Sequence, residues 1–389
     1  MKDSLRLLML NYEFPPLGGG AGSATYHMAI ELQKRGHRVD ILTAREKGGR
    51  AFETIEGVRV FRVPSFRFGV HDAGISGAAS YLFFARLELA HLMRENRYDL
   101  MHYYFGLPTG VLSFYSHLKH GIPYIVSLRG SDVPGYDPNR KALLSMHQLL
   151  ESTRRKIWHN ASAVVANSNS LRQLAIDSDG GCNIEVIPNG VDTERFAPAR
   201  TPRGKDDPLQ VLCVSRLIPR KGLTTLIEAA AELRDSNIEV EIVGSGEMAR
   251  GLRKLIRSLH LQQCVSLTGF MARPELASRY RRADIFVLPS LSESCAMALL
   301  EALSSGLPVI VSNVGGNPEI VRHEENGLLF EAGSSAGLAA ALRRLTAAPA
   351  LRARMSENNL SKIRTQHAWQ HIARRYEGVY RRVVDSHAR

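Results

Sequence analysis

Short apolar runs alternate with amphipathic segments along most of the chain. In the first half, apolar runs that are typical of buried strands occur at 5–10, 39–43, 58–63, 100–104, 124–128, 163–167 and 185–187. The clearest amphipathic segment between them predicts a helix over 23–35 that stops at Gly36. Strands that alternate with helices indicate a parallel α/β sheet.

The same order begins again after a polar stretch at 197–208. Further apolar runs lie at 210–215, 239–243, 264–268, 285–288, 308–312 and 327–330, with a helix predicted over 223–234. Each half opens as strand, glycine-containing loop, helix and strand. The sequence therefore predicts two doubly wound, Rossmann-like parallel-sheet domains, at 1–200 and 201–365. The helical tail, 366–389, has no strand to return to, and we expect it to pack back on the first domain.

Composition narrows the class of protein without naming a function. The 389 residues are 44% hydrophobic and 23% charged, which excludes a disordered chain, a collagen-like repeat and a small disulfide scaffold. The one departure from average is a formal charge of +12. An acidic partner follows from it: nucleic acid, an anionic membrane surface or a phosphorylated small molecule. Residues 351–389 carry nine Lys and Arg against three Asp and Glu, which a solvated helix face also explains.

The cysteines and the N-terminus bear on where the protein works. The four cysteines are far apart and form no C-x-x-C pair: Cys182, Cys213, Cys264 and Cys295. This favours reduced, mostly buried thiols over zinc ligands or disulfides. The N-terminus reads as a first strand rather than a signal peptide, and no stretch is apolar enough to span a bilayer. We expect a cytoplasmic protein, at most peripheral at the cytoplasmic face of a membrane.

The first candidate motif is the glycine-rich loop at 17–22. Its glycines follow a strand and precede a helix, so their backbone N–H groups can approach an anion at the helix N-terminus. The loop matches neither the dinucleotide fingerprint nor a P-loop. A tight turn would give the same pattern.

The second motif opens the other domain. Arg216 ends the strand at 210–215, and Lys221 lies five residues later at the start of the next helix. Two fixed cations beside a helix N-terminus suit a diphosphate, because Arg offers a planar fork and Lys a point charge. Their place at the carboxyl end of a strand favours this interpretation over two exposed basic side chains.

The third motif contains two carboxylates eight residues apart. Glu293 is expected at the start of a helix and Glu301 two turns further along it. At ~1.5 Å per residue they would lie about 12 Å apart, too far for an acid–base pair on one glycosidic bond. The spacing suits two carboxylates that bind hydroxyls at the two ends of one elongated ligand. A Glu at the helix N-terminus and a Glu on the helix surface would give the same pattern.

Together these segments resemble the retaining glycosyltransferases of family 4, which have the GT-B fold. VSRLIPRKG resembles the family's G-R-L-x-x-x-K-G signature, with Ser215 in place of the usual Gly. PSLSESCAMALLEALSSGLP resembles its E-x7-E block, and IPNGVDTERFAP resembles the segment between its domains. The matching segments run in the same order from about Leu5 to Phe330.

The resemblance implies transfer of a sugar from a nucleotide diphospho-sugar to a hydroxyl, with retention of configuration and without metal or cofactor. Arg216 and Lys221 would hold the diphosphate, Glu293 the donor sugar and Glu301 the ribose. The rest of the donor pocket would be lined by Gly19, Gly20, Gly246, Met271, Ser294, Cys295, Ala296 and Met297. Gly20 would reach the phosphate from the other domain, so the site would be complete only on closure.

One position departs from the family. SLRGSD aligns with a segment where many members read His-Gly-x-Asp, so that Arg129 stands in place of a histidine near the reaction centre. Arginine cannot act as a base at neutral pH. Arg129 could stabilise the departing phosphate, contact an anionic substrate or be structural, while Asp132 stays available nearby. His102, which follows a strand, could touch the acceptor.

The acceptor is less defined than the donor. A glycan or a lipid-linked hydroxyl fits, as in polysaccharide biosynthesis, and loops at 66–77 and 135–158 are candidates to bind it. A helix expected over 139–160 could lie against a membrane or pack within its domain. Two other functions remain open: a nucleotide-sugar 2-epimerase on the same fold, and a non-enzymatic polyanion-binding protein. Nucleic acid is disfavoured because basic and aromatic residues are not interleaved.

Overall fold

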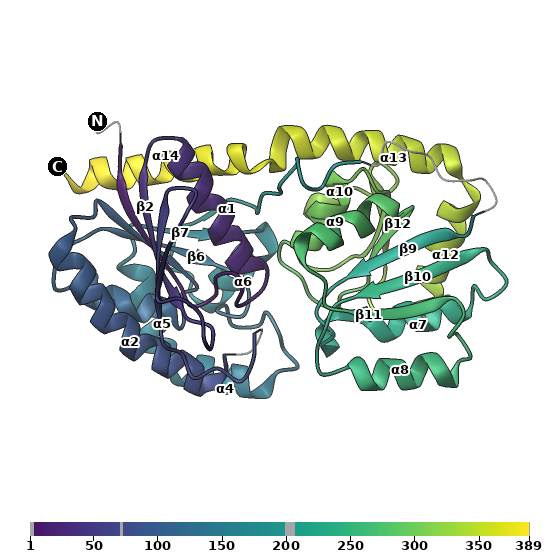
Figure 1. Ribbon diagram of the computed structural model, residues 1–389, viewed down its shortest axis with the longest axis horizontal. Helices are drawn as coiled ribbons and strands as arrows, with labels where there is room; N and C mark the ends of the chain where they lie inside the picture. Colours follow the sequence, from purple (N-terminus) through teal and green to yellow (C-terminus); the bar gives the residue numbers. More distant parts are fainter. Residues whose placement is uncertain (1–3, 71–72, 199–206, 389) are drawn as a thin grey trace. The chain divides into compact units, whose positions relative to one another are not determined.

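The computed structural model describes residues 4–70, 73–198 and 207–388, which form two compact units (Figure 1). The first unit comprises residues 1–189 and 369–389, and the second comprises residues 190–368. The division falls between Asn189 and Gly190, earlier than the expected boundary at residue 200. Two contacts explain this: the Val191 N–H donates to the carbonyl of His367 at 2.8 Å, and Phe196 is buried in a core cluster of the second unit.

The sheet of the first unit has eight strands in the order β3-β4-β2-β1-β5-β6-β7-β8. All neighbours are parallel except β3, which pairs antiparallel with β4 at the edge. The strands are β1 (Arg6–Asn11), β2 (Arg38–Ala44), β3 (Phe52–Ile55), β4 (Val58–Val63), β5 (Leu100–Tyr104), β6 (Tyr124–Leu128), β7 (Ala163–Ala166) and β8 (Ile184–Val186).

Helices cover both faces of this sheet. Figure 1 shows α14, in yellow, and α2 on opposite sides of it, and α1 packs beside α14. The helices are α1 (Gly20–Lys34), α2 (Gly74–Glu95), η1 (Thr109–Leu112), α3 (Ser113–Ser116), α4 (Lys141–Leu149), α5 (Glu151–His159), α6 (Asn169–Ser178) and α14 (Trp369–His387). The helix expected over 139–160 is thus two helices, α4 and α5, with Leu150 between them.

The C-terminal helix α14 uses its charges within the first unit. Arg382 donates to Glu185 at 2.6 Å, and Arg381 and Arg35 both pair with Glu377. The Arg375 guanidinium donates to the carbonyl of Val186. Arg382 and Arg375 of the tail therefore hold the helix on strand β8, and Arg35 at the end of α1 binds it through Glu377.

The second unit has six strands, all parallel, in the order β11-β10-β9-β12-β13-β14. They are β9 (Leu209–Val214), β10 (Ile238–Val243), β11 (Val265–Gly269), β12 (Ile285–Leu288), β13 (Val309–Ser312) and β14 (Gly327–Phe330). The order reverses between β9 and β12, and this is where ligands bind in open α/β sheets.

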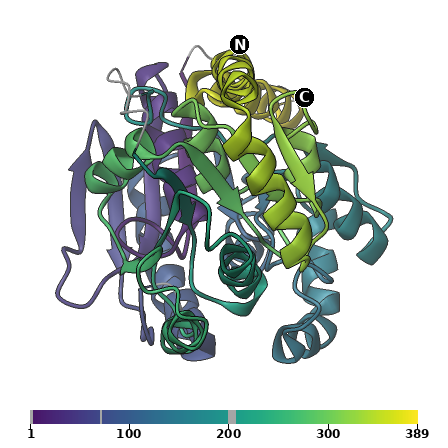
Figure 2. The same ribbon diagram turned by 90° about the vertical axis from the view of Figure 1, so that its right-hand side faces the viewer.

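Helices also cover both faces of the second sheet, and α12 is visible in yellow-green in Figure 2. They are η2 (Pro219–Lys221), α7 (Leu223–Ala231), α8 (Ala249–Ser258), α9 (Arg273–Arg282), α10 (Met297–Ser304), α11 (Asn317–Ile320), α12 (Ser335–Ala347), α13 (Pro349–Lys362) and the π-helical turn η3 (Ile363–His367). Among the described residues, no helix is both long enough and apolar enough to cross a bilayer.

Candidate active site

The loops that follow β9 and β12 meet at the point where the strand order of the second sheet reverses. Lys221, from the first loop, donates a hydrogen bond to the Glu293 carboxylate, from the second. Both side chains are nearly buried, with exposed fractions of 12% and 5%. A buried ion pair at a strand's carboxyl end is a candidate functional site, because such pairs add little to stability.

A glycine allows the two loops to approach this closely. Gly222 has a φ of +60°, and a Cβ at this position would lie 2.1 Å from the carbonyl oxygen of Pro289. The neighbouring backbone closes the contact, since the Leu291 N–H donates to the carbonyl of Arg220 at 2.8 Å. The chain on either side of Lys221 is thereby fixed against the segment that carries Glu293.

The Glu293 carboxylate has further partners in the same loops. The Ser290 hydroxyl donates to Oε1 at 2.8 Å, and the Arg220 guanidinium lies 4.0 Å from Oε2. Burial alone would raise the pKa of Glu293, but the charges of Lys221 and Arg220 outweigh it and hold the pKa below its ordinary value. Glu293 is therefore ionised at neutral pH, as an acceptor for sugar hydroxyls must be.

Arg216 lies in the same loop but is exposed. Its positive charge acts on the Lys221 ammonium, and its side chain has no hydrogen-bond or ion-pair partner among the residues that the structure describes. Arg216 is therefore a cation near the ion pair that an anionic ligand can engage.

Helix α10 begins later than the sequence suggested. It starts at Met297, so Glu293 lies in the preceding loop rather than at the helix start, and the spacing of 12 Å along one helix does not apply. Ala296 occupies the N-cap, and no side chain caps the first turn. Ser294, Cys295 and Ala296 are buried, while Met297 is half-buried. The uncapped amides of this segment are donors that suit an anion.

Glu301 lies further along α10 in a different environment. The Tyr280 hydroxyl donates to Glu301 Oε2 at 3.1 Å, and the Arg273 guanidinium lies 3.6 Å from Oε1. Burial raises the pKa of Glu301 despite the opposing charge of Arg273. The two carboxylates of the E-x7-E block thus have pKa values shifted in opposite directions.

The remaining candidates in the second unit border the same loops. Cβ atoms at Gly244 and Gly246 would collide with the carbonyls of Ser215 and Leu217, so the turn after β10 packs directly on the chain around Arg216. Met271 is buried in a core cluster that also contains Cys295 and Ala296. These residues shape the site, and Met271 itself is buried.

Gly19 and Gly20 lie in the first unit, at the start of α1. The Gly19 N–H donates to Oε2 of Glu13 at 3.3 Å, and no side chain caps the helix. Gly18 has a φ of +86°, and a Cβ there would overlap the Glu13 side chain. A carboxylate oxygen of the chain itself is therefore bound by the amide that was expected to face phosphate.

Arg129 also lies in the first unit, and only part of the hydrogen-bonding capacity of its guanidinium is used. It donates to Oδ1 of Asn189 at 2.8 Å and lies over the Tyr104 ring, 4.6 Å from its centroid. Its Nε is buried without a hydrogen-bond partner among the described residues. Asp132 was expected to be available for chemistry, but it is buried. Its carboxylate accepts hydrogen bonds from the N–H groups of Arg129, Gly130 and Gly106.

His102 does not face a ligand either, which corrects the expectation that it could touch the acceptor. Its ring is fully buried beneath α14, with Nδ1 2.8 Å from the Tyr380 hydroxyl and Nε2 2.7 Å from the Ser127 hydroxyl. Burial, together with the charge of Arg129, places the pKa of His102 well below its ordinary value. A neutral histidine anchors the helix here.

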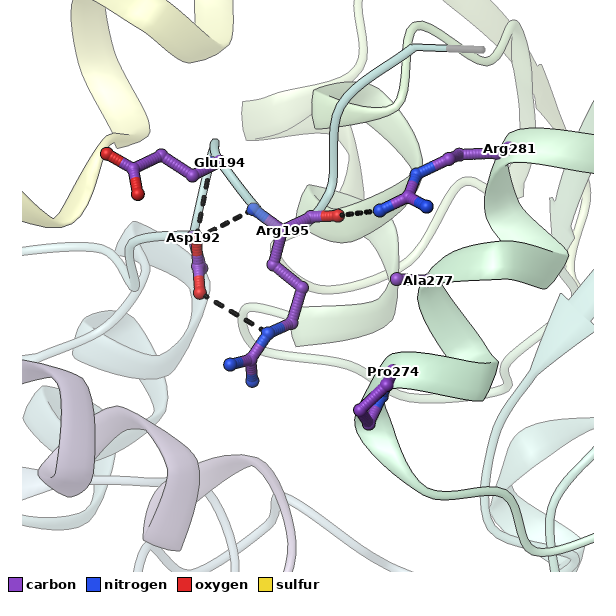
Figure 3. A pocket seen from close by; sticks show the side chains of 6 residues that line it. All are labelled: Asp192, Glu194, Arg195, Pro274, Ala277 and Arg281. Atoms are coloured by element: carbon purple, nitrogen blue, oxygen red, sulfur yellow. Dashed lines mark hydrogen bonds and ion pairs between the residues drawn. The ribbon is translucent and has the colours of Figure 1, made fainter.

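A separate hollow of about 430 Å³ lies in the second unit, and Figure 3 shows the side chains that line it. Asp192, Glu194 and Arg195 line one side, and Pro274, Ala277 and Arg281 of α9 line the other. The Arg281 guanidinium donates to the carbonyl of Arg195 at 3.0 Å. None of the predicted site residues lines this hollow, although its wall residue Pro274 follows Arg273, the partner of Glu301.

One cluster in the first unit has metal-ligand chemistry. His159, Asp179 and Cys182 bring ligand atoms within 4.8 Å of one another. The Asp179 carboxylate already pairs with His159 at 3.1 Å and with Arg155 at 3.5 Å. A structural ion pair accounts for this cluster.

Sequence reasoning missed several residues that build the site. Ser290, Arg220 and Tyr280 bind the two carboxylates. Gly315 was missed as well: it has a φ of +53°, and a Cβ there would lie 1.9 Å from the carbonyl oxygen of Glu293. The glycine pair at 315–316 in SNVGGNPE was the one available signal, since paired glycines often mark a close backbone approach.

The arrangement of two doubly wound units defines the class of protein. Sucrose-phosphate synthase from Thermosynechococcus elongatus has the same fold, with a TM-score of 0.84 and 22% identity over 98% of this chain and 100% of that one. The expected GT-B fold, with two Rossmann-like parallel sheets, is thereby confirmed.

The sequence comparisons identify the family. Residues 18–195 match Glycosyltransferase Family 4, and residues 197–362 match Glycosyl transferases group 1. An Escherichia coli UDP-Gal:alpha-D-GlcNAc-diphosphoundecaprenol alpha-1,3-galactosyltransferase is 31% identical over 71% of this chain and 73% of its own length. A Mycobacterium tuberculosis GDP-mannose-dependent alpha-(1-6)-phosphatidylinositol monomannoside mannosyltransferase is 28% identical over 84% and 85%. The chain belongs to the family 4, group 1 type glycosyltransferases.

Proposed function

We propose that this glycosyltransferase moves a sugar from a nucleotide diphospho-sugar to a hydroxyl of a glycan or lipid-linked acceptor, with retention and without a metal ion. The observation that carries the proposal is the buried pair of Lys221 and Glu293, with Arg216 unpaired beside it among the described residues. The Glu293 carboxylate can accept hydrogen bonds from a sugar, and the neighbouring cations can bind a diphosphate.

In the proposed reaction, the bond between the sugar's anomeric carbon and the phosphate oxygen breaks while the acceptor oxygen bonds to the same carbon. The acceptor proton passes to the departing phosphate, on the same face of the sugar. Lys221, Arg216 and the uncapped amides at 296–297 would stabilise the charge that grows on the leaving diphosphate. Glu293 would accept hydrogen bonds from the sugar, and Glu301 from the ribose. Arg129 would contact an anionic substrate group.

The two relatives support the substrate classes. Their names specify UDP-galactose and GDP-mannose as donors, and diphosphoundecaprenol and phosphatidylinositol derivatives as acceptors. Both acceptors are lipids, so by analogy we propose a lipid-linked acceptor in polysaccharide or glycoconjugate synthesis. The protein would then work in the cytoplasm, against the cytoplasmic face of a membrane.

The test is a panel of UDP-, GDP- and ADP-sugars, with thermal shift for binding and donor turnover for activity. A true donor raises the apparent stability by mass action. Glu293→Gln and Lys221→Met should lower turnover by about a hundredfold or more, whereas Lys254→Met, on an exposed position of α8, should not. EDTA should leave turnover unchanged.

Three outcomes would contradict the proposal. The first is that no nucleotide sugar shifts the melting temperature. The second is that both site variants turn over donor like the wild type. The third is an epimerised donor in proton NMR without any acceptor, which would favour the 2-epimerase instead.

A further inference from the structure

Large apolar side chains are exposed together on one part of the first unit. They lie in the loop that follows β4 and along α2. Their exposed fractions are 67% for Phe66, 81% for Phe68, 41% for Val70, 84% for Ile75, 63% for Phe83 and 57% for Leu87. Single exposed apolar residues are ordinary, but a contiguous group marks an interaction surface.

Helix α2 shows why this surface needs a partner. One stripe, with Gly77, Tyr81, Ala85 and Leu89 at four-residue spacing, is buried against the unit. A second stripe runs at the same spacing through Ile75, Ala79, Phe83 and Leu87, and it is exposed. A surface helix ordinarily presents polar residues to water. α2 is instead apolar on its outer side.

Basic side chains border the outer stripe. The Arg86 guanidinium lies 3.1 Å from the centroid of the Tyr115 ring, and the Lys119 ammonium lies 5.4 Å from the same centroid. Leu118, next to Lys119, is 64% exposed. The sequence has no Asp or Glu from Leu100 to Ser131. Arg86 and Lys119 therefore lie beside the apolar surface, and the segment that carries Lys119 has no acid to neutralise them.

We propose that this surface docks on an anionic lipid bilayer. We call it the α2 face, defined by Phe66, Phe68, Val70, Ile75, Phe83, Leu87 and Leu118. Apolar and aromatic side chains enter the boundary between headgroups and acyl chains, while Arg86 and Lys119 attract anionic headgroups. The inference deepens the proposed function and rests on it in one respect: a lipid-linked acceptor would be met at such a surface.

Charge complementarity favours a membrane over a second copy of the chain. A two-fold contact through this surface would bring Arg86 and Lys119 of both copies into one interface. The acids on α2 itself are Glu88, which is half-exposed, and Glu95, which is exposed at the end of the helix. An anionic bilayer satisfies the apolar stripe and the cations together.

The experiment is flotation of the full chain with vesicles of phosphatidylcholine alone or with a third of phosphatidylglycerol, and no nucleotide sugar. We expect binding to the anionic vesicles that weakens at high salt. The Phe68→Asp/Phe83→Asp variant should lower the partition coefficient by about tenfold or more. Phe52→Asp is the matched control, because Phe52 is 51% exposed on β3 of the same unit. Melting temperatures verify that all variants fold.

Two results would overturn the inference. One is equal vesicle binding by the wild type and the double aspartate variant, or no binding by either. The other is a dimer in sedimentation velocity that the double variant dissociates, which would make the α2 face a contact between copies. Glu293→Gln should bind vesicles like the wild type. Loss of sugar transfer with retained vesicle binding would therefore contradict only the proposed function.

Discussion

Lys221 and Glu293 form a buried ion pair that links the loop after β9 to the loop after β12, across 72 positions of sequence. The pair is held by contacts made by other residues: Gly222 packs on Pro289, and Gly315 packs on the backbone of Glu293. The cost of desolvating the two charges offsets most of their attraction. A well-packed apolar pair at these positions would therefore stabilise the unit at least as much. The charges are better explained by a ligand that carries both phosphate and hydroxyl groups.

Lys221→Met should therefore separate stability from activity. The substitution leaves Glu293 buried without its main counter-charge, and we expect a loss of about 3–5 kcal/mol in the free energy of unfolding. Donor turnover should fall by about 10²–10³-fold. Urea unfolding and a transfer assay measure the two effects.

The control for this prediction is the double variant Lys221→Met/Glu293→Gln. Removing the buried charge as well should recover much of the lost stability, while turnover stays low because both grips on the donor are gone. If turnover recovered together with stability, the pair would be structural rather than catalytic.

The two carboxylates of the E-x7-E block should give opposite pH dependences. The pKa of Glu293 is lowered in the folded state, so its charge contributes stability above its ordinary pKa near 4.5 that is lost as pH falls through the folded value. The pKa of Glu301 is raised in the folded state, so its charge destabilises the fold above the folded value and has no such effect below 4.5.

Glu293→Gln and Glu301→Gln test this reasoning as a pair. The unfolding free energy of Glu293→Gln should be lower than that of the wild type, and this deficit should grow as pH rises from 3 to 7. That of Glu301→Gln should move in the opposite direction over the range in which Glu301 ionises. Denaturant unfolding at a series of pH values measures both differences, and slopes of the same sign would contradict the prediction.

Gly222→Ala should be severe although it adds only a methyl group. Its Cβ would lie 2.1 Å from a backbone carbonyl, and the backbone there has a φ of +60°. We expect a loss of about 1–3 kcal/mol in unfolding free energy and a drop in turnover, because Lys221 is displaced from Glu293. Gly251→Ala is the control: a Cβ there meets nothing within 4 Å in α8, so it should be neutral or stabilising. Equal effects of the two substitutions would show that the loop tolerates the shift.

The sequence predicted most of the fold, because apolar runs bounded by glycine and proline mark buried parallel strands clearly. The strands β4, β5, β6, β12 and β14 have the predicted bounds. β3 was missed: it is a short antiparallel edge strand, and its residues, Phe52 to Ile55, are not buried. Helix starts were less accurate, since α10 begins at Met297 after Ala296, an N-cap residue without a capping side chain that the sequence could reveal.

The site was predicted unevenly for a similar physical reason. Lys221 was found from its place after the carboxyl end of a strand, and Glu293 because a family resemblance marks it. Their partner Arg220 was missed because it acts through a contact between loops distant in sequence, and Ser290 because nothing in its own residue type marks it. The prediction for His102 was wrong because a histidine at this place in the sequence can either contact a ligand or hold a helix against the sheet from a buried position. Which of the two holds depends on α14, whose Tyr380 lies 278 positions later.

That anchor can be tested directly. The Tyr380 hydroxyl is 2.8 Å from Nδ1 of His102 in a fully buried environment. Tyr380→Phe keeps the ring but leaves one nitrogen of His102 without a partner, which should lower the unfolding free energy by about 1–3 kcal/mol. Tyr26→Phe is the control, since its hydroxyl reaches Glu56 only at 3.5 Å in an exposed position. Denaturant unfolding of both variants at pH 7 measures the difference. If Tyr380→Phe were as stable as Tyr26→Phe, the hydrogen bond would contribute nothing to holding α14 on the sheet, and the helix would be held by its arginine contacts and by apolar packing.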